Sequence, residues 1–295
     1  MPYQLIDKAI EQLARQWSCS IDNFKLIHRH VDKAAYSAIY PDGNRVIVKM
    51  DLRIARHRNE LLMLGLAKSY ELPIPQVIFA DDGEFGVTVL TWLPGEPLSL
   101  DDELGCVNTG ALLRKLHSIP ATARIRPFSR SDGTWSSLCA RYTDEVRIFA
   151  EFGLMNSSMT ERLREILIGA FANSREPQMT MIHGDFQELH VLLNPSTKEV
   201  SGLLDLADSG LGDPLWDIAV LTSRSISCTK DVLHGYDADD ALMERASKII
   251  PAYRVVRWMG EVRWRLLQKN DISFQIAQLT AAARDESKEH QCTLA

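Results

Sequence analysis

Two neighbouring stretches decide the fold: residues 182–193 read IHGDFQELHVLL, and residues 202–219 read GLLDLADSGLGDPLWDIA. In both stretches a short apolar run, typical of a buried strand, ends at polar residues. Asp185 follows Gly184, which permits a tight backbone turn. His190 comes five residues after Asp185, and Asp205 comes fifteen residues later. The pattern therefore predicts strands that deliver polar side chains to loops.

Phosphoryl transfer needs a set of groups of this kind. One carboxylate orients the acceptor hydroxyl, and further ligands hold Mg²⁺ against the β- and γ-phosphates. Placement and charge neutralisation supply most of the rate, because the transition state is loose. A lone HGD sequence would indicate ordinary turn chemistry. The joint spacing of the two stretches, after a β-rich region with a strand lysine, favours a kinase-like site.

The chain divides into two regimes. Up to about residue 92, hydrophobic periodicity predicts helices at 3–17 and 53–68 and strands at 24–30, 34–40, 45–50, 72–80 and 87–93. The sequence LPGEPL then interrupts the pattern. Beyond it the chain is mostly helical, with helices expected at 106–119, 158–171 (with Ser158 and Glu161 at capping-box spacing), 241–250 and 253–269. We expect an N-terminal lobe at 1–92, a hinge at about 90–95 and a helical lobe at 93–295.

Composition narrows the class of protein. The chain has 295 residues, of which 45% are hydrophobic and 24% charged, so a collagen-like or disordered chain is excluded. A net charge of −6 disfavours nucleic acid as a partner. No apolar run approaches the roughly 18 residues of a membrane span, and the N-terminus lacks a signal-peptide core. Five scattered cysteines, which we expect to be reduced thiols of a cytoplasmic protein, are Cys19, Cys106, Cys139, Cys228 and Cys292.

The two stretches resemble the catalytic and metal-binding motifs of the aminoglycoside/macrolide phosphotransferase family. The family pattern reads HGDxxxxN and then [IL]D(W)xxAxxGDPxxDLA, whereas this chain has HGDFQELH and LDLADSGLGDPLWDIA. Weaker similarity extends over residues 58–78, 87–98 and 110–120. The resemblance implies an α+β, bilobal protein-kinase-like fold, with a small β-rich N-terminal lobe and a larger helical C-terminal lobe.

The resemblance also implies roles for individual residues. Asp185 would be the catalytic base, or the group that orients the acceptor hydroxyl. Asp205 would be a Mg²⁺ ligand, and His183 would brace the catalytic loop. Asp217 is expected to bond that loop, and Asp213 to cap a helix.

His190 stands where the family pattern has Asn. An Asn carbonyl suits hard Mg²⁺, and imidazole is a softer ligand, so the change could indicate an inactive protein. However, the macrolide phosphotransferases commonly have HGDxxxxH, which resembles this chain. We therefore expect His190 to be a metal ligand or a group on the phosphate side of the site. The same residue gives a macrolide a slight preference over an aminoglycoside as the acceptor.

Lys49 ends the strand predicted at 45–50, and its ammonium is expected to reach the nucleotide phosphates. Glu60, eleven residues later on a predicted helix, would hold that ammonium in place. Alone, both charges would be interpreted as solvated. The motifs of the second half favour a functional pair. The cations near the start of the same helix are expected to form a solvated helical face: Arg53, Arg56, His57 and Arg58.

The remaining nucleotide contacts are expected in the first lobe. The loop that would cover the phosphates, residues 30–37, has no glycine, so the Ser37 hydroxyl is a candidate contact. Leu90 would flank the base, while Thr91 and Leu93 would offer backbone groups to the purine. Adenine and guanine are not distinguished, so ATP and GTP both stay open as donors.

Few patterns in the sequence indicate which residues would form the acceptor pocket. Aromatic and charged residues at 253–264 recur at helical spacing and are expected to be core, and residues 237–241 are expected to be a helix cap. We expect a monomeric antibiotic phosphotransferase that uses Mg²⁺ and a purine nucleoside triphosphate. Two alternatives stay open: a metabolic small-molecule kinase of the same fold and a nucleotide-binding pseudokinase.

Overall fold

The computed structural model describes residues 2–121, 125–128, 135–172 and 174–284. These residues form two compact units. Unit 1 comprises the described residues up to Pro97 together with Leu189–Ser209, and unit 2 comprises those of Leu98–Glu188 and from Gly210 onward. The first break lies near the expected hinge. Residues 189–209, which the sequence placed in the helical lobe, cluster instead with the N-terminal residues.

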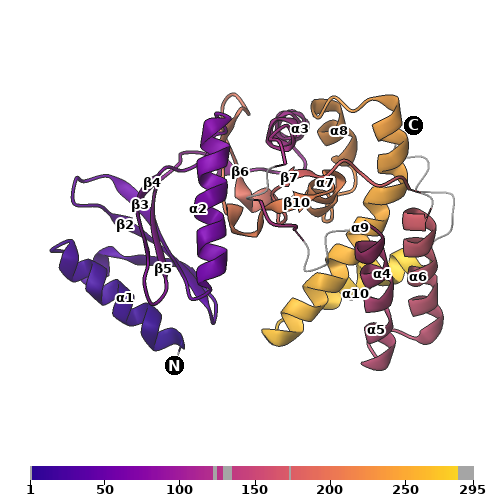
Figure 1. The fold of residues 1–295 in the computed structure, drawn as a ribbon, viewed down its shortest axis with the longest axis horizontal. Helices are drawn as coiled ribbons and strands as arrows, with labels where there is room; N and C mark the ends of the chain where they lie inside the picture. Colours follow the sequence, from indigo (N-terminus) through magenta and orange to yellow (C-terminus); the bar gives the residue numbers. More distant parts are fainter. Residues whose placement is uncertain (1, 122–124, 129–134, 173, 285–295) are drawn as a thin grey trace. The chain divides into compact units, whose positions relative to one another are not determined.

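Unit 1 is built on an antiparallel five-stranded sheet in the order β1-β2-β3-β5-β4 (Figure 1). Its elements up to Pro97 are α1 (Pro2–Gln16), η1 (Ile21–Asn23), β1 (Lys25–Arg29), β2 (Lys33–Ile39), β3 (Arg45–Asp51), α2 (Ile54–Ser69), β4 (Val77–Asp82), β5 (Gly86–Thr91) and β6 (Glu96–Pro97). Their bounds lie within a few residues of those expected, except that β4 begins at Val77, after the prolines of LPIP.

The two faces of this sheet differ because successive side chains of β3 point to opposite faces. Val46, Val48 and Met50 are buried in one core with Ile6 and Ile10 of α1. Lys49 therefore points to the opposite face, where α2 lies. Figure 1 shows α1 and α2 on opposite sides of the sheet. Burial of each such aliphatic side chain contributes roughly 1.5–3 kcal/mol, which fixes the side that Lys49 presents.

The second part of unit 1 carries a small sheet in the order β6-β8-β9, formed by β6, β8 (Val191–Leu193) and β9 (Val200–Leu203). The turn η2 (Glu188–His190) precedes β8, and η3 (Leu206–Asp208) follows β9. Ser201 Oγ donates to the Pro94 carbonyl at 2.7 Å. Gly95 has a φ of +132°, and a Cβ there would lie 2.3 Å from Ser201 Oγ. The Pro-Gly connection is thus packed directly on β9.

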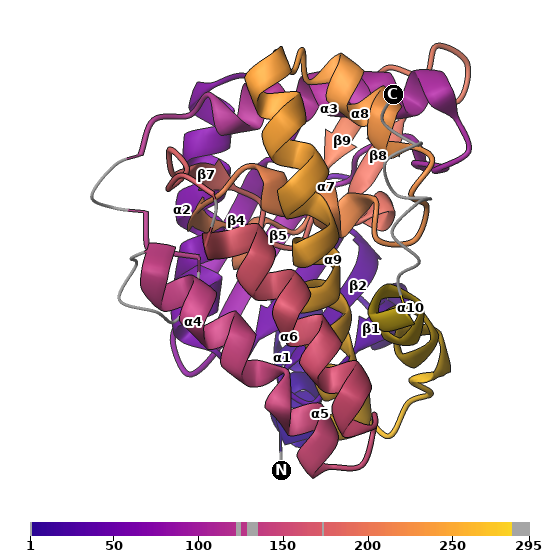
Figure 2. The same ribbon diagram turned by 90° about the vertical axis from the view of Figure 1, so that its right-hand side faces the viewer.

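Unit 2 is mostly helical. Its elements are α3 (Glu103–His117), α4 (Trp135–Glu145), α5 (Arg147–Glu151), α6 (Ser157–Ala172), β7 (Thr180–Ile182), β10 (Gly210–Gly212), α7 (Leu215–Leu221), α8 (Thr229–Gly235), α9 (Asp240–Leu267) and α10 (Ser273–Arg284). Figure 2 shows α4, α6 and α9 side by side, and α6 and α9 both pack on α10. β7 and β10 form a two-stranded antiparallel sheet. This sheet leads into the HGD sequence at one end and the GDP sequence at the other.

Two helix assignments differ from expectation. The helices expected at 241–250 and 253–269 are one continuous helix, α9, with Pro251 inside it. Proline costs a helix about 3 kcal/mol, but buried residues on both sides of Pro251, among them Ile250 and Tyr253, favour continuity. The cap of α6 is Asn156, whose side chain accepts from the Met159 N–H at 2.9 Å, and not Ser158.

Four cysteines are free thiols, namely Cys19, Cys106, Cys139 and Cys228, while Cys292 lies outside the described residues. Within the part of the chain that the structure describes, no helix is both long and apolar enough to cross a membrane.

Candidate active site

Lys49 lies between two carboxylates within unit 1. Its Nζ donates to Glu60 Oε1 of α2 and, at 2.8 Å, to Asp205 Oδ1. The three side chains are largely buried, and only 6% of Glu60 is exposed. Burial disfavours the ammonium, yet Asp205 and Glu60 raise its pKa above the ordinary value. The lysine, glutamate and aspartate that the sequence singled out are therefore in direct contact.

Asp205 occupies an unusual backbone position between β9 and η3. Its φ of +59° lies in the left-handed region, which is uncommon for a residue other than glycine. The preceding N–H, of Leu204, donates to the His190 carbonyl at 2.8 Å. Burial works against ionisation of Asp205, but the charges of Lys49 and His190 hold its pKa well below the ordinary value. His190 Nε2 lies 3.9 Å from Asp205 Oδ2.

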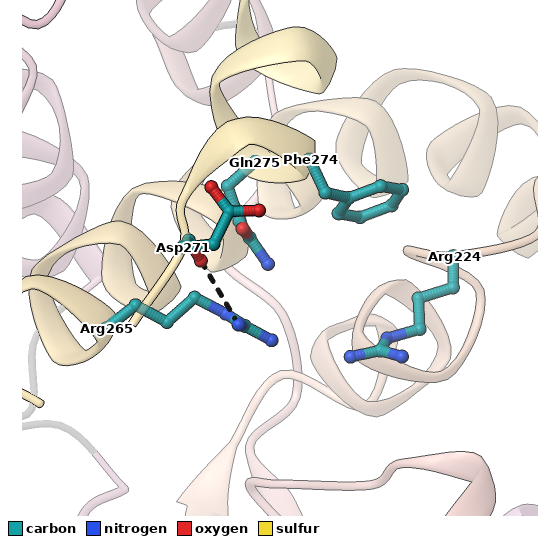
Figure 3. Close-up of a pocket in the computed structure, with 5 residues that line it drawn as sticks. All are labelled: Arg224, Arg265, Asp271, Phe274 and Gln275. Carbon is teal, nitrogen blue, oxygen red and sulfur yellow. Dashed lines mark hydrogen bonds between the residues drawn. The ribbon is translucent and has the colours of Figure 1, made fainter. Parts of the chain in front are cut away.

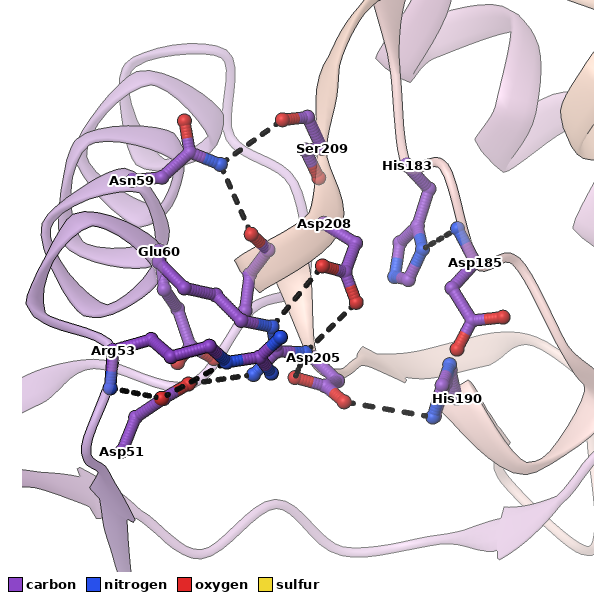
Figure 4. A network of polar contacts seen from close by, with 12 residues as sticks. Asp51, Arg53, Asn59, Glu60, His183, Asp185, His190, Asp205, Asp208 and Ser209 are labelled. Atoms are coloured by element: carbon purple, nitrogen blue, oxygen red, sulfur yellow. Dashed lines mark hydrogen bonds and ion pairs between the residues drawn. The ribbon is translucent and has the colours of Figure 1, made fainter. Parts of the chain in front are cut away.

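Arg56 of α2 corrects one prediction, because it is buried and does not lie on a solvated face. Its Nε and Nη2 donate to Asp208 at 3.0 and 2.8 Å, and its Nη1 donates to Asp51 at 2.9 Å. Figure 4 shows the Asp205 and Asp208 carboxylates beside each other. The carboxylates of residues 205–208 face α2, so the arginine has partners that sequence position alone did not reveal. His57 is also buried, with Nδ1 3.2 Å from Thr88 Oγ1.

Asn59 joins the same helix to the same segment through backbone groups. Its Nδ2 donates to the Ala207 and Ser209 carbonyls at 3.1 and 3.0 Å (Figure 4). Asn59 and Glu60 follow Arg56 by three and four residues, so both lie on the side of α2 that carries Arg56. The spacing of Arg56 from Glu60 and the position of Asn59 next to Glu60 were the available sequence signals for these two residues.

The other nucleotide candidates lie in or beside the sheet. Ser37 is buried in the middle of β2 and pairs with Ile47, and Leu90 pairs with Ile47 from the other side. Ser37 and Leu90 therefore share the face of Lys49. The Thr91 N–H donates to the Gln76 carbonyl at 2.9 Å, so this N–H is engaged within unit 1. Leu93 lies just past β5 and is half-buried.

The loop expected to cover the phosphates is a tight hairpin between β1 and β2. The His30 N–H donates to the Lys33 carbonyl at 2.8 Å. At the tip, the Asp32 carbonyl accepts from the Leu52 N–H at 2.8 Å, and its carboxylate pairs with Arg53 at 2.9 Å. The short turn closes without glycine because its hydrogen bonds anchor it to β3 and to the start of α2.

The HGD loop of unit 2 is held by Asp217. Its two carboxylate oxygens accept from the backbone N–H of His183 at 2.7 Å and of Gly184 at 2.9 Å. His117 Nε2 lies 3.1 Å from the same carboxylate. His183 is fully buried, and its Nδ1 accepts from the Asp185 N–H at 3.3 Å (Figure 4). His183 and Asp217 thus both contact the backbone around Asp185.

The Asp185 carboxylate has side-chain partners from two directions. Gln187 Nε2 donates to both of its oxygens at 2.9 Å. Arg257 Nη1 of α9 donates to Oδ1 at 2.8 Å. Arg257 also donates from Nε to Glu261 at 2.8 Å. From its helical spacing, this segment was expected to be core, so the contact of Arg257 with Asp185 was not predicted.

Much of α9 is indeed core. Tyr253 and Trp258 are buried, whereas Trp264 is 45% exposed. Asp213 accepts from the Leu215 N–H at 3.1 Å, which caps α7, and also from Tyr253 and Arg245. Asp239 caps α9 by accepting from the Leu242 N–H at 2.8 Å. Asp213 and Asp239 therefore stabilise the starts of helices in unit 2.

A pocket of about 340 Å³ lies on unit 2 and is lined by Arg224, Arg265, Asp271, Phe274 and Gln275 (Figure 3). The pocket has two links to the HGD loop. Arg224 lies 3.7 Å from Glu188, three residues after Asp185. Gln275 donates to Glu261 at 2.7 Å, and Glu261 binds Arg257. No pattern in the sequence indicated this pocket.

Comparison with known proteins places this architecture in a family. The family model described as "Phosphotransferase enzyme family" matches residues 24–257. This chain belongs to that family. Streptomycin 3''-kinase of Streptomyces griseus is 27% identical over 187 residues, covering 59% of this chain and 67% of that protein.

Solved structures share the fold at low identity. The GDP complex of wild-type aminoglycoside 2'-phosphotransferase-IIIa has a TM-score of 0.73 at 15% identity and covers 95% of this chain and 98% of that one. A thermostable mutant of aminoglycoside phosphotransferase APH(4)-Ia, in complex with ADP and hygromycin B, has a TM-score of 0.72 at 15% identity. The match covers 94% of this chain and 98% of that one. Macrolide 2'-phosphotransferase MphH from Brachybacterium faecium has a TM-score of 0.66 at 15% identity, and the match covers 96% of this chain and 99% of that one. The α+β, kinase-like fold predicted from the motifs is confirmed.

Proposed function

We propose that this protein transfers the γ-phosphate of ATP or GTP to a hydroxyl group of an antibiotic. The observation that carries the proposal is the contact of Lys49 with both Glu60 and Asp205 in a member of the phosphotransferase family. A buried ammonium fixed by two carboxylates is suited to bind phosphate oxygens, which carry most of the charge in this reaction. Relatives that act on or bind antibiotics support the acceptor class.

The metal side of the site fits Mg²⁺ bound together with a nucleotide. Among the residues that the structure describes, no group of three or more His, Cys, Asp and Glu could hold a metal. Mg²⁺ commonly uses one or two protein ligands plus substrate phosphates, so a full cage is not required. Asp205 and His190 would hold it, because these two side chains lie beside each other within unit 1, with His190 Nε2 3.9 Å from Asp205 Oδ2. When bound, the ion would neutralise charge on the β- and γ-phosphates.

The acceptor side centres on Asp185. Its carboxylate would accept a hydrogen bond from the acceptor hydroxyl and orient that oxygen toward the γ-phosphorus. It would take the proton as the new P–O bond forms and as the bond from the γ-phosphorus to the bridging oxygen breaks, which releases the nucleoside diphosphate. His183 and Asp217 hold the backbone of this loop, so they would support the orientation without touching the substrate. Lys49 would bind the phosphates from unit 1.

The finer identity of the acceptor rests on two opposing indications. His190 favours a macrolide through the HGDxxxxH pattern, while the relative found by sequence is a streptomycin kinase. We keep both antibiotic classes in the proposal, with ATP and GTP as donors, since the solved relatives include ADP and GDP complexes.

The test is acceptor-stimulated nucleotide turnover by the purified protein. Wild type and Asp185→Asn are assayed with ATP or GTP and Mg²⁺ against streptomycin, hygromycin B and erythromycin, and product mass is used to detect the added phosphate. We expect turnover by wild type with at least one antibiotic and its loss in the variant. Amino alcohols and sugars are assayed in parallel, and turnover only with these acceptors would indicate a metabolic kinase. Nucleotide binding without turnover of any acceptor would indicate a pseudokinase.

A further inference from the structure

Arg257 lies outside both sequence motifs, yet it contacts the proposed catalytic carboxylate. It is on α9, its side chain is only 17% exposed, and its Nη1 donates to Asp185 Oδ1 at 2.8 Å. A guanidinium that is mostly removed from water needs partners, because an unpaired buried charge is strongly unfavourable. Its partners here are Asp185 and Glu261, which use different edges of the guanidinium.

Glu261 fixes the other edge of Arg257. Its Oε1 accepts from Arg257 Nε at 2.8 Å, one helical turn along α9. Its Oε2 accepts from Gln275 Nε2 of α10 at 2.7 Å. An ionised carboxylate can accept hydrogen bonds but cannot donate them, so the Gln275 side chain must turn its NH₂ group toward Glu261. Gln275 is 1% exposed, and its side-chain oxygen has no hydrogen-bond partner within the described residues. Gln275, Glu261, Arg257 and Asp185 thus form one hydrogen-bonded chain.

This series of hydrogen bonds fixes the direction of the Asp185 carboxylate from outside the HGD loop, which contacts within the loop cannot do. Gln187 belongs to the same loop and moves with it, although it too binds the carboxylate. Arg257 and Glu261 are on a 28-residue helix packed on α7 and α10. A guanidinium presents its donors in a rigid planar fork, so it fixes direction as well as distance. Phosphoryl transfer depends mainly on placement, so a fixed carboxylate direction bears directly on rate.

We propose that Arg257 is a positioning residue for Asp185 in phosphoryl transfer, and that Glu261 and Gln275 hold Arg257 in turn. The inference rests on the proposed function, because it assigns a purpose to the contact with Asp185. It gives α9 and α10 a part in the reaction as well as in the core. It also predicts an order of effects on the rate: substitution of Arg257 should lower kcat most, substitution of Glu261 less, and substitution of Gln275 least, because each lies one hydrogen bond farther from Asp185.

The kinetic test compares Arg257→Ala, Arg257→Lys, Glu261→Ala and Gln275→Leu with wild type. We expect Arg257→Ala to lower kcat by about 100-fold while both KM values stay within about threefold of wild type, because the placement of the base changes and substrate binding does not. Arg257→Lys should retain more activity, since it keeps the charge but not the fork. Glu261→Ala and then Gln275→Leu should have progressively smaller effects.

Chemical rescue separates positioning from a purely structural role. Millimolar guanidinium chloride should restore a measurable part of the kcat of Arg257→Ala, because the ion can occupy the site between Asp185 and Glu261. A merely destabilised protein would not be rescued. The matched control is Arg263→Ala, also on α9, whose side chain is 54% exposed and pairs with Glu145 at 3.3 Å. This control should keep wild-type kcat, with or without guanidinium.

A second measurement does not depend on turnover. Amide hydrogen exchange in residues 184–187 should be faster in Arg257→Ala and Glu261→Ala than in wild type, and unchanged in Arg263→Ala. Unchanged exchange together with wild-type kcat in Arg257→Ala would overturn the inference. A raised acceptor KM with unchanged kcat would also overturn it, since Arg257 would then bind substrate. Inactivity of wild type with every acceptor would instead count against the proposed function, and the exchange experiment would still decide the role of Arg257.

Discussion

The charged cluster of unit 1 places two cations among four carboxylates, whereas the cluster of unit 2 places one cation between two. The first consists of Lys49, Arg56, Asp51, Glu60, Asp205 and Asp208, and the second of Arg257, Asp185 and Glu261. The cluster of unit 1 therefore has an excess of two negative charges, which one Mg²⁺ would balance. The cluster of unit 2 has an excess of one negative charge, which suits a group that accepts one proton.

The difference indicates a division of labour between the clusters. In unit 1 four carboxylates share two cations, so this cluster would exchange partners on binding a metal ion and phosphates. In unit 2 the single cation fixes the direction of one carboxylate. Substitutions in unit 1 should therefore change binding and stability, and substitutions in unit 2 should change the rate of the chemical step.

The largest expected effect is that of Asp185→Asn in unit 2. The amide cannot take the acceptor proton, so we expect kcat to fall by roughly 10²–10⁴-fold. The dissociation constant for the nucleotide should stay unchanged, because Lys49, the proposed phosphate-binding cation, belongs to the other cluster. Steady-state kinetics and calorimetric titration of nucleotide measure the two quantities. Full activity of Asp185→Asn would remove the proposed role of this residue.

Next in size is the effect of Arg56→Met on the stability of unit 1. The substitution leaves the buried Asp51 and the half-exposed Asp208 without their shared guanidinium. Breaking a buried pair costs about 3 kcal/mol in the free energy of unfolding, which urea denaturation measures. The matched control is Arg58→Met on the same helix, whose side chain is 64% exposed and pairs with Asp82, and which should cost less than about 1 kcal/mol. Equal losses in the two variants would show that Arg56 acts as a surface charge.

The same contrast explains what sequence could predict. Lys49, Glu60, Asp185 and Asp205 lie in motifs whose spacing carries their chemistry, and the β-rich and helical regimes follow from hydrophobic periodicity. The family resemblance then supplied the kinase-like fold. The roles of Arg56 and Arg257 were not predicted because their partners Asp208 and Asp185 lie 152 and 72 residues away in the sequence. A charged residue on a helix has the same local pattern whether its partner is water or a distant carboxylate.

Local rules also failed where packing outweighed them. Proline usually ends a helix, but buried residues flank Pro251 on both sides in α9. The segment 189–209 is sequentially part of the helical half, yet it clusters with unit 1 because Asp205 and Asp208 bind cations from β3 and α2. Both outcomes depend on tertiary contacts that no short window of sequence contains.

A smaller effect is expected for His190→Ala in unit 1. The loss of one proposed ligand should raise the Mg²⁺ concentration for half-maximal activity by about tenfold, a value typical of a weakened metal site. His190→Asn, which restores the family residue, should bring that concentration back toward wild type, because a carbonyl oxygen suits Mg²⁺. Titration of activity with Mg²⁺ at saturating nucleotide provides the measurement. An identical Mg²⁺ dependence in all three proteins would assign His190 a structural role.

The smallest effect concerns the stability of unit 1 at acidic pH. Partial burial of the ring, together with the nearby charges of Lys33 and His30, lowers the pKa of His28 from 6.5 to about 4, although the residue as a whole is exposed. Between these values the unfolded chain binds a proton at His28 that the folded chain does not. The contribution to the free energy of unfolding is thus fully present above pH 6.5 and is lost as the pH falls toward 4. Urea denaturation of wild type and His28→Gln across this range should show a shallower decline in the variant, while parallel curves would mean that His28 titrates alike in both states.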